Sequence, residues 1–465
     1  APVNLSAYHA LGDLRLGDFH ISYADVSDHL QTSIGHFTQE ELQEAVNAVI
    51  VRKCGSKIYW DVWAQDIAVI AKRHIERIAE IIRTEPPVRE QFDVFLQGLR
   101  DSLNESVTED QAVEMLAQHV ITLPVFEALF GGGFAGSNPV SVAMEDMITI
   151  LRRHELETPE EKRELAELYA SVRIRAEGVK TDAGRQQTIK DLYENFFRYA
   201  FKATSEAMGV VYTPTQVVRY ILHFTNRMLQ QEFGQTFADK DVHILDPFTG
   251  TGTFIVDLIG DESLIPADKL PYKYANEIHC NEILLLAYYI ATINIETAYH
   301  NRVGGEYVPF EGAVLTDTFQ MHEEGDPIDR TVFPGNSKRI DRQKDVDVRV
   351  IIGNPPYSAG QKSANDNNEN ESYPTLDAKI ENTYARYGKS GNKQNLYDSY
   401  IRAFRWASNR IGECGIIAFV SGAGWLDGAY ADGMRKCLRE EFNSIYVLNL
   451  RGNREFRRLS KTQLI

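Results

Sequence analysis

The 465-residue sequence predicts an α/β fold in which a doubly wound, largely parallel sheet with helices on both faces follows an all-helical region. Three patterns support this prediction. Residues 38–201 carry apolar side chains at helical spacing. From residue 243 onward, short apolar runs alternate with longer helical stretches, as in a parallel sheet with crossover helices. The first of these runs leads into a helix through a turn that contains two glycines, a feature of nucleotide-binding sheets.

The helical region is defined by an apolar face and by clear break signals. We expect breaks at residues 85–87, 131–133 and 138–139, where proline and glycine interrupt the pattern. Thr158 followed by Pro159 and Glu161 predicts a capped helix start. His119 is expected to be a packed or capping histidine, since nothing in this region has the spacing of metal ligands or of a nucleophile. The predicted apolar faces consist of Trp60, Trp63, Ile67, Ile70, Ala71, His74, Ile75, Ile78 and Ile82, and of Leu192, Phe196, Phe197 and Ala200.

The glycine turn follows a short strand predicted at residues 243–246. Asp246, Pro247 and Phe248 stand at the end of the strand, and Gly250 and Gly252 precede a helix expected to begin near Thr253. Glycine allows the backbone to pass close to a ligand. Because no Lys-Ser or Lys-Thr pair follows, we do not expect a triphosphate site.

Two acidic residues end the next predicted strands. Glu282 precedes the helical run 283–295, and at such a strand end a carboxylate can accept hydrogen bonds from both hydroxyls of a ribose. Glu277 is the rival for this role, but it enters the strand and is expected to face solvent. Asp317 ends the run 312–317, where it could accept a hydrogen bond from the adenine amino group of a cofactor. The alternative for either acid alone is a surface carboxylate.

The apolar run 350–353 ends in Asn354, Pro355, Pro356 and Tyr357. An amino group on a nucleobase is a poor nucleophile because its lone pair is delocalised into the ring. The Asn354 side-chain oxygen and the Pro355 carbonyl can each accept one amino hydrogen, and two prolines stiffen the turn that carries them. Tyr357 offers a flat face on which an extruded base can stack. The alternative is an ordinary structural turn.

Taken in order, these segments resemble the N6-adenine DNA methyltransferases of the gamma arrangement, which use S-adenosylmethionine. The resemblance covers residues 209–453 and includes the stretches 393–397 and 415–425. It implies in-line methyl transfer to a flipped adenine, with Asn354, Pro355, Pro356 and Tyr357 as the catalytic residues and Asn354 also in contact with the cofactor. The cofactor residues that it implies are Tyr212, Thr213 and Pro214 at the methionine end, Asp246, Pro247, Phe248, Gly250 and Gly252 in the glycine motif, Glu282 at the ribose and Asp317 at the adenine.

The helical region indicates a more specific family within this group of methyltransferases. Residues 117–130, 138–141 and 192–197, which lead into 209–214, look like the coupler and methyltransferase parts of type ISP restriction-modification enzymes. We therefore expect residues 1–37 to be a linker or the start of the helical domain, 38–205 the coupler-like domain and 206–465 the methyltransferase domain. The resemblance implies double-stranded DNA as a partner. It also implies an ATP-driven translocase, a nuclease and a target-recognition domain in the full-length chain, which we expect this sequence to lack.

The formal charge of −17 is unusual for a protein that binds DNA by itself. A basic cluster near the end is the candidate for phosphate contacts, with an ordinary charged surface as the alternative. Cys54, Cys280, Cys414 and Cys437 match neither a disulfide framework nor a zinc site, and no apolar run is long enough to span a membrane, so we expect a cytoplasmic protein without a bound metal. The basic cluster consists of Arg435, Lys436, Arg439, Arg451, Arg454, Arg457, Arg458 and Lys461.

Residues 358–392, rich in Asn, Ser, Lys and Glu, are expected to form a long mobile loop or, alternatively, a loop that becomes ordered over the flipped base. Two other functions remain open at this stage. A protein glutamine N5-methyltransferase would use the same Asn-Pro-Pro-Tyr motif to activate an amide nitrogen. A cofactor-binding structural module would join other domains and transfer nothing by itself.

Overall fold

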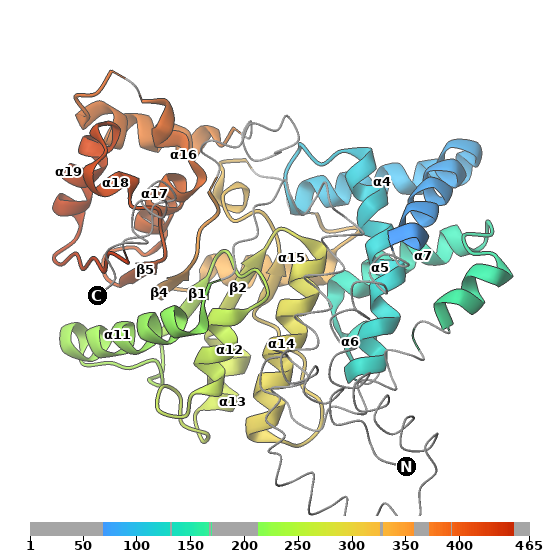
Figure 1. Ribbon diagram of the computed structural model, residues 1–465, viewed down its shortest axis with the longest axis horizontal. Coiled ribbons are helices and arrows are strands. Elements are labelled where there is room, and N and C mark those ends of the chain that lie inside the picture. Colours follow the sequence, from blue (N-terminus) through green and yellow to red (C-terminus); the bar gives the residue numbers. More distant parts are fainter. Residues whose placement is uncertain are drawn as a thin grey trace, which may run out of the picture.

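A computed structural model describes residues 68–130, 133–166, 169, 213–325, 329–357, 372–391 and 393–450 (Figure 1). The predictions for Trp60, Trp63 and Ile67, and for the face containing Leu192 and Phe196, lie outside these residues, as do those for Cys54, Phe197 and Ala200. None of the helices that the structure describes is long and apolar enough to cross a membrane.

The second half of the chain contains a five-stranded sheet in the order β3-β2-β1-β4-β5, and all neighbouring strands are parallel. The predicted doubly wound α/β fold is therefore confirmed. After β3 the chain crosses to the other side of β1, so the direction of winding reverses between β1 and β4. Ligands of open α/β sheets bind at the carboxyl ends of the strands at such a point. The strands are β1 (His243–Asp246), β2 (Ile278–Glu282), β3 (Ala313–Leu315), β4 (Val348–Gly353) and β5 (Ile416–Phe419).

Successive strand residues point to opposite sides of the sheet, and because both sides carry apolar residues, helices cover both faces. Ile244 and Ile352 belong to one buried cluster, which includes residues of α12 and α14, whereas Leu245 and Ile351 belong to another, which includes α16, α17 and α19. The helices of this half are α11 (Thr215–Phe233), α12 (Thr253–Gly260), α13 (Leu270–Asn276), α14 (Leu285–Val303), α15 (Pro334–Asp345), α16 (Pro374–Ile380), α17 (Ser399–Arg410), α18 (Gly424–Asp427) and α19 (Asp432–Glu441).

The first half of the described chain is helical, as predicted, and its breaks lie where expected. A helix covers residues 68–84, followed by α4 (Pro86–Ser102), α5 (Glu109–Phe130), α6 (Phe134–Ser137) and α7 (Pro139–Arg152). Asn138 caps α7 by accepting hydrogen bonds from the backbone of the next turn. Thr158 and Glu161 form reciprocal side-chain to backbone hydrogen bonds, which confirms the predicted capping box.

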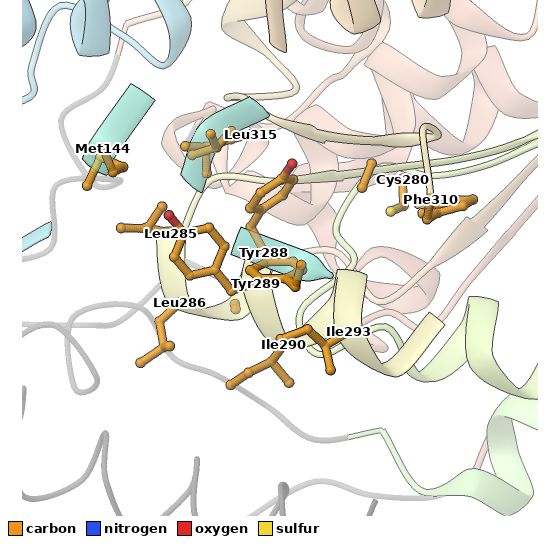
Figure 2. Packing of buried hydrophobic residues seen from close by; sticks show 14 of the residues in the cluster. Met144, Cys280, Leu285, Leu286, Tyr288, Tyr289, Ile290, Ile293, Phe310 and Leu315 are labelled. Atoms are coloured by element: carbon orange, nitrogen blue, oxygen red, sulfur yellow. The ribbon is translucent and has the colours of Figure 1, made fainter. Parts of the chain in front are cut away.

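The helical region and the sheet domain share one hydrophobic core. Figure 2 shows Tyr288 and Tyr289 of α14 in the same cluster as Met144 of α7. The two tyrosine hydroxyls satisfy buried polar groups of the helical region: Asn138 Nδ2 donates to Tyr288 at 3.0 Å, and His119 Nδ1 lies 2.9 Å from the hydroxyl of Tyr289. His119 is fully buried there, as expected for a packed histidine.

Close backbone packing supports the same interface. Gly98 in α4 lies against Val332, which precedes α15, and a Cβ added at Gly98 would lie 2.6 Å from Val332 Cβ. Nearby, the rings of Phe95 and Phe333 are 5.9 Å apart. The helical region therefore contacts the sheet domain over a packed surface, which fixes the position of α4 relative to α15.

Residues 358–392 were predicted to form one long loop, but part of this stretch is helical. Residues 358–371 and 392 lie outside the described part, but α16 and a π-helical turn (Glu381–Ala385) occupy much of the rest. Leu376, Ile380 and Tyr384 recur every four residues and are all buried, which provides the apolar face of a packed helix. The polar composition of the stretch as a whole concealed this short pattern.

Candidate active site

The candidate site lies at the carboxyl ends of β1 and β4, where the winding of the sheet reverses. Asp246 ends β1, and Asn354 directly follows β4. The two strands are hydrogen-bonded neighbours, and a Cβ added at Gly353 would lie 2.8 Å from Asp246 Oδ1. Glycine at position 353 therefore permits the close approach that brings the glycine turn and the Asn-Pro-Pro-Tyr motif together.

Asn354 is partly buried and held from two sides. Its Nδ2 donates to Thr213 Oγ1 at 3.0 Å, and its Oδ1 accepts from the Tyr357 hydroxyl at 3.2 Å. The same hydroxyl lies 3.3 Å from the Val420 carbonyl oxygen, beyond β5, and the Tyr357 ring lies 5.8 Å from that of Tyr400. Burial raises the pKa of Tyr357 to about 12, so the hydroxyl remains a donor at neutral pH. The Asn354 oxygen thus has a fixed position and direction.

Thr213 was predicted as a cofactor residue, and the structure places it against Asn354. It is 8% exposed and stands two residues before α11, whose N-cap is Pro214. Pro214 is exposed, whereas Pro355 is buried and Pro356 is partly buried. Tyr212, the other residue predicted for this motif, lies outside the described residues.

The predicted glycine turn connects β1 to α12, which begins at Thr253 as expected. Gly250 and Gly252 have φ values of 56° and 87°, a region that side chains other than glycine rarely occupy. A Cβ at Gly252 would also lie 3.2 Å from the Ala291 Cα in α14, whereas a Cβ at Gly250 would meet nothing within 4 Å. Gly252 therefore permits helix packing, and Gly250 leaves the backbone open to a ligand.

Asp246 is fully buried, and its two oxygens have different surroundings. Oδ1 accepts the backbone N–H of Phe248 at 3.1 Å, whereas Oδ2 has no hydrogen-bond partner among the described residues. Burial raises the pKa of Asp246 to about 8, and the nearby Glu282 carboxyl acts in the same direction. Pro247 is buried, and the Phe248 ring packs 5.5 Å from Phe319. A buried carboxyl oxygen without a partner is the kind of group that a bound ligand satisfies.

Glu282 lies at the end of β2, as predicted, and it holds the glycine turn. Its Oε2 accepts the N–H of Gly250 at 2.7 Å, while Oε1 accepts the N–H groups of Ile283 and Leu284 at 3.0 and 2.9 Å. Burial raises the pKa of Glu282 to about 7, although these three hydrogen bonds oppose the rise. Oε2 keeps one acceptor position and is the oxygen that a ribose hydroxyl could use.

The prediction that Glu277 faces solvent is wrong. Glu277 is 1% exposed and pairs with the equally buried Lys273 at 2.5 Å, one helical turn earlier. Its other oxygen accepts the N–H of Asp241 at 2.7 Å. Glu277 therefore neutralises a buried lysine at the amino end of β2, on the opposite side of the sheet from the candidate site.

Asp317 lies two residues beyond β3 and is 4% exposed. Oδ1 accepts the backbone N–H groups of Phe319 and Gln320, and Oδ2 accepts Asn104 Nδ2 at 3.0 Å and the Tyr373 hydroxyl at 2.8 Å. Burial raises the pKa of Asp317, and the hydrogen bonds oppose this rise. Sequence analysis missed Asn104 and Tyr373, because no local signal connects either of them with an acid so far along the chain.

Three residues of the predicted basic cluster, Arg435, Lys436 and Arg439, lie on α19 in the described part of the chain. The Arg435 guanidinium donates to the carbonyl oxygens of Trp425 and Gly428 at 2.8 and 2.9 Å. Lys436 lies 3.9 Å above the Tyr387 ring centroid and pairs with Glu440. Arg439 is exposed on α19, and the five basic residues from Arg451 onward lie outside the described part. Arg435 therefore supports a local turn.

Two family models match the chain. Residues 59–184 match the coupler domain of type ISP restriction-modification enzymes, and residues 184–387 match the N-6 DNA methylase domain. A comparison with curated protein sequences gave no match. The family matches agree with the resemblance inferred from the motifs.

Three solved structures have similar folds and sequences. A nuclease-deletion mutant of the type ISP restriction-modification enzyme LlaGI, in complex with a DNA substrate mimic, is 42% identical with a TM-score of 0.78, over 87% of this chain and 33% of that one. The ATP-dependent type ISP enzyme LlaBIII bound to DNA is 43% identical with a TM-score of 0.77, over 86% and 27%. The DrdV–DNA complex is 35% identical with a TM-score of 0.74, over 83% and 38%. This chain thus spans well under half of each relative.

Proposed function

Since the chain belongs to the type ISP restriction-modification family through its coupler and N-6 methylase regions, we propose that it transfers a methyl group from S-adenosylmethionine to N6 of a flipped adenine in double-stranded DNA. The observation that carries the proposal is the position of Asn354. Its side-chain oxygen is fixed at the carboxyl end of β4, beside the buried Asp246 and the open glycine turn. Activation of an amino group requires an aimed acceptor at this point of the fold.

The residues at the site fit S-adenosylmethionine. The open backbone at Gly250 allows close approach, and the remaining acceptor position of Glu282 Oε2 suits a ribose hydroxyl. The unpartnered Asp246 Oδ2 provides a further acceptor. We assign the methionine end to the segment that contains Tyr212, Thr213 and Pro214, and the adenine end to Asp317. Pro247, Phe248 and Gly252 complete the turn that shapes this site.

The chemistry of the chain's own residues is positioning and hydrogen bonding. When bound, S-adenosylmethionine supplies a methyl group on a sulfonium, which carries its own leaving group. Asn354 Oδ1 and the Pro355 carbonyl accept the two amino hydrogens of the adenine and draw electron density toward the attacking nitrogen. As the nitrogen becomes cationic these hydrogen bonds strengthen, so they stabilise the transition state more than the ground state. The proton then leaves to water, and Tyr357 provides a face for the flipped base.

Several properties of the longer enzymes are proposals for this chain. We propose that double-stranded DNA is the partner, and that an ATP-driven translocase, a nuclease and a target-recognition domain act with this chain in the full-length protein. The division into residues 1–37, 38–205 and 206–465 is likewise proposed. Because the net charge is −17, most of the affinity for DNA would come from those other domains. We also propose a cytoplasmic location.

The test measures S-adenosylmethionine binding by calorimetry together with transfer of labelled methyl to mixed-sequence duplex DNA. Binding with label at adenine N6 would support the proposal. Binding without transfer to DNA would indicate a structural module that depends on other domains, and label on a release-factor peptide in place of DNA would indicate a glutamine N5-methyltransferase. Absence of binding would overturn the assignment of the cofactor site.

A further inference from the structure

The acceptor capacity of Asp317 is already filled by the protein. An ionised carboxylate offers about four lone-pair positions, two on each oxygen. On Oδ1, the backbone N–H groups of Phe319 and Gln320 donate at 2.9 and 3.3 Å. On Oδ2, Asn104 Nδ2 and the Tyr373 hydroxyl donate at 3.0 and 2.8 Å. A fifth donor, such as the adenine amino group assigned to this acid, therefore has to replace one of these four.

The two donors on Oδ2 are the candidates for replacement, because the two on Oδ1 belong to the backbone turn that follows β3. Tyr373 is the more firmly held. Its ring contacts Phe319 edge to face at 5.2 Å and lies 5.2 Å below the Arg402 guanidinium. Arg402 is itself fixed by two 2.8 Å hydrogen bonds to Asp377. Displacement of the Tyr373 hydroxyl would disturb this whole packed group.

Asn104 is the weaker donor, and it comes from the helical region. It follows α4 and is 6% exposed, and its bond to Asp317 joins residues 213 positions apart. Its own oxygen accepts the Ser106 hydroxyl at 2.6 Å and the Ser106 N–H at 3.2 Å, which directs the amide nitrogen toward Asp317. A neutral amide at 3.0 Å can leave by rotation of one side chain, without movement of a helix.

We propose that Asn104 occupies the position on Asp317 Oδ2 that the adenine amino group of the cofactor takes, so that the helical region and the cofactor compete for one acceptor. The inference rests on the proposed function, because Asp317 must be the adenine acid. The exchange keeps the number of hydrogen bonds to a buried carboxylate constant. By linkage, cofactor binding then loosens one contact of the helical region with the sheet domain, and that contact weakens cofactor binding to the same extent. Asn104 is thus a positioning residue.

The experiment compares two ligands by calorimetry: S-adenosylhomocysteine, and its analogue in which hydrogen replaces the 6-amino group. Asn104→Ala should tighten binding of S-adenosylhomocysteine roughly 2- to 10-fold, the range that one net hydrogen bond supports, and should leave the analogue unchanged. The matched control is Gln97→Ala, which removes an exposed hydrogen bond to Asp101 on the same helix and should change neither affinity. Ser106→Ala, which loosens Asn104 without removing it, should act in the same direction with a smaller effect.

The outcomes separate this inference from the proposed function. Tighter binding confined to the ligand with the amino group would support competition at Asp317. Unchanged or weaker binding of S-adenosylhomocysteine to folded Asn104→Ala and Ser106→Ala proteins would overturn the competition and leave the cofactor site standing. If the wild-type chain binds neither ligand, both the cofactor site and the competition fail. Thermal melts of each variant establish that it is folded.

Discussion

Substitution of Asn354 by Ala should almost abolish methyl transfer and leave the cofactor bound. The substitution removes the side-chain oxygen that accepts an amino hydrogen and the Nδ2 bond to Thr213. Loss of one hydrogen-bonding group aimed at developing charge costs about 3–4 kcal/mol in the transition state, or roughly 10²- to 10³-fold in rate. The bond to Thr213 is made in the ground state too, and its loss costs about 1 kcal/mol at most, so the cofactor Kd should change by less than about 5-fold.

Thr213→Val supplies the matched control. It removes the acceptor of Asn354 Nδ2 but keeps Asn354 Oδ1 and its contact with the Tyr357 hydroxyl. At saturating S-adenosylmethionine, loss of a cofactor contact at Thr213 does not limit the rate, so the rate reports the weakened anchoring of the oxygen and should fall by roughly 5- to 10-fold, far less than in Asn354→Ala. The comparison separates loss of the acceptor from loss of its alignment.

The assay is single-turnover transfer of labelled methyl at saturating S-adenosylmethionine, to a duplex with one unpaired adenine. The unpaired base lowers the cost of flipping, so that the measured rate reports chemistry. Calorimetry on the same proteins reports cofactor binding. A rate for Asn354→Ala within 10-fold of wild type would refute the transition-state role. Loss of cofactor binding in the same variant would refute the division between binding and catalysis.

Three further predictions concern stability. Burial raises the pKa of Asp246 from 3.8 to about 8, so the folded chain retains a proton that the unfolded chain releases. Wild-type stability should therefore fall as pH rises from about 4 to about 8, and Asp246→Asn should lack this part of the decline. Parallel curves of Tm against pH for the two proteins would contradict this. Gly252→Ala should lower the urea midpoint by the equivalent of about 1–2 kcal/mol and weaken cofactor binding, whereas Gly260→Ala, with open space around its Cβ, should do neither. Gly98→Ala should lower Tm despite the higher helix propensity of alanine, and an unchanged or higher Tm, as expected for the uncrowded Gly136→Ala, would argue against tight packing at this interface.

The ends of the strands could be predicted because their signals are local. Each apolar run is short and leads into a polar residue of the candidate site: Asp246 and Glu282 are the last residues of β1 and β2, and Asp317 and Asn354 follow β3 and β4. In a parallel sheet the carboxyl ends of the strands lie along one edge, which is where the structure places these residues. The helix breaks at proline and glycine were predictable for the same reason.

The partners of these residues could not be predicted, because they depend on packing between distant segments. Asn104 and Tyr373 meet at Asp317 from positions 213 and 56 residues away. The role of Glu277 was misjudged for a related reason. Its burial depends on Lys273 one helical turn earlier, and that pairing becomes recognisable only when α13 is known to continue toward β2. Local patterns thus predict the elements, and tertiary contacts decide the state of each side chain.

Helix α14 belongs to both halves of the molecule at once. Its first turn follows Glu282, Ala291 in its middle supports Gly252, and Tyr288 and Tyr289 on its side bond to Asn138 and His119 of the helical region. An α-helix is stiff over this length, so α14 connects the two halves rigidly. Because α14 contacts Gly252 on one side and Asn138 and His119 on another, a change in its tilt would shift the glycine turn relative to the helical region.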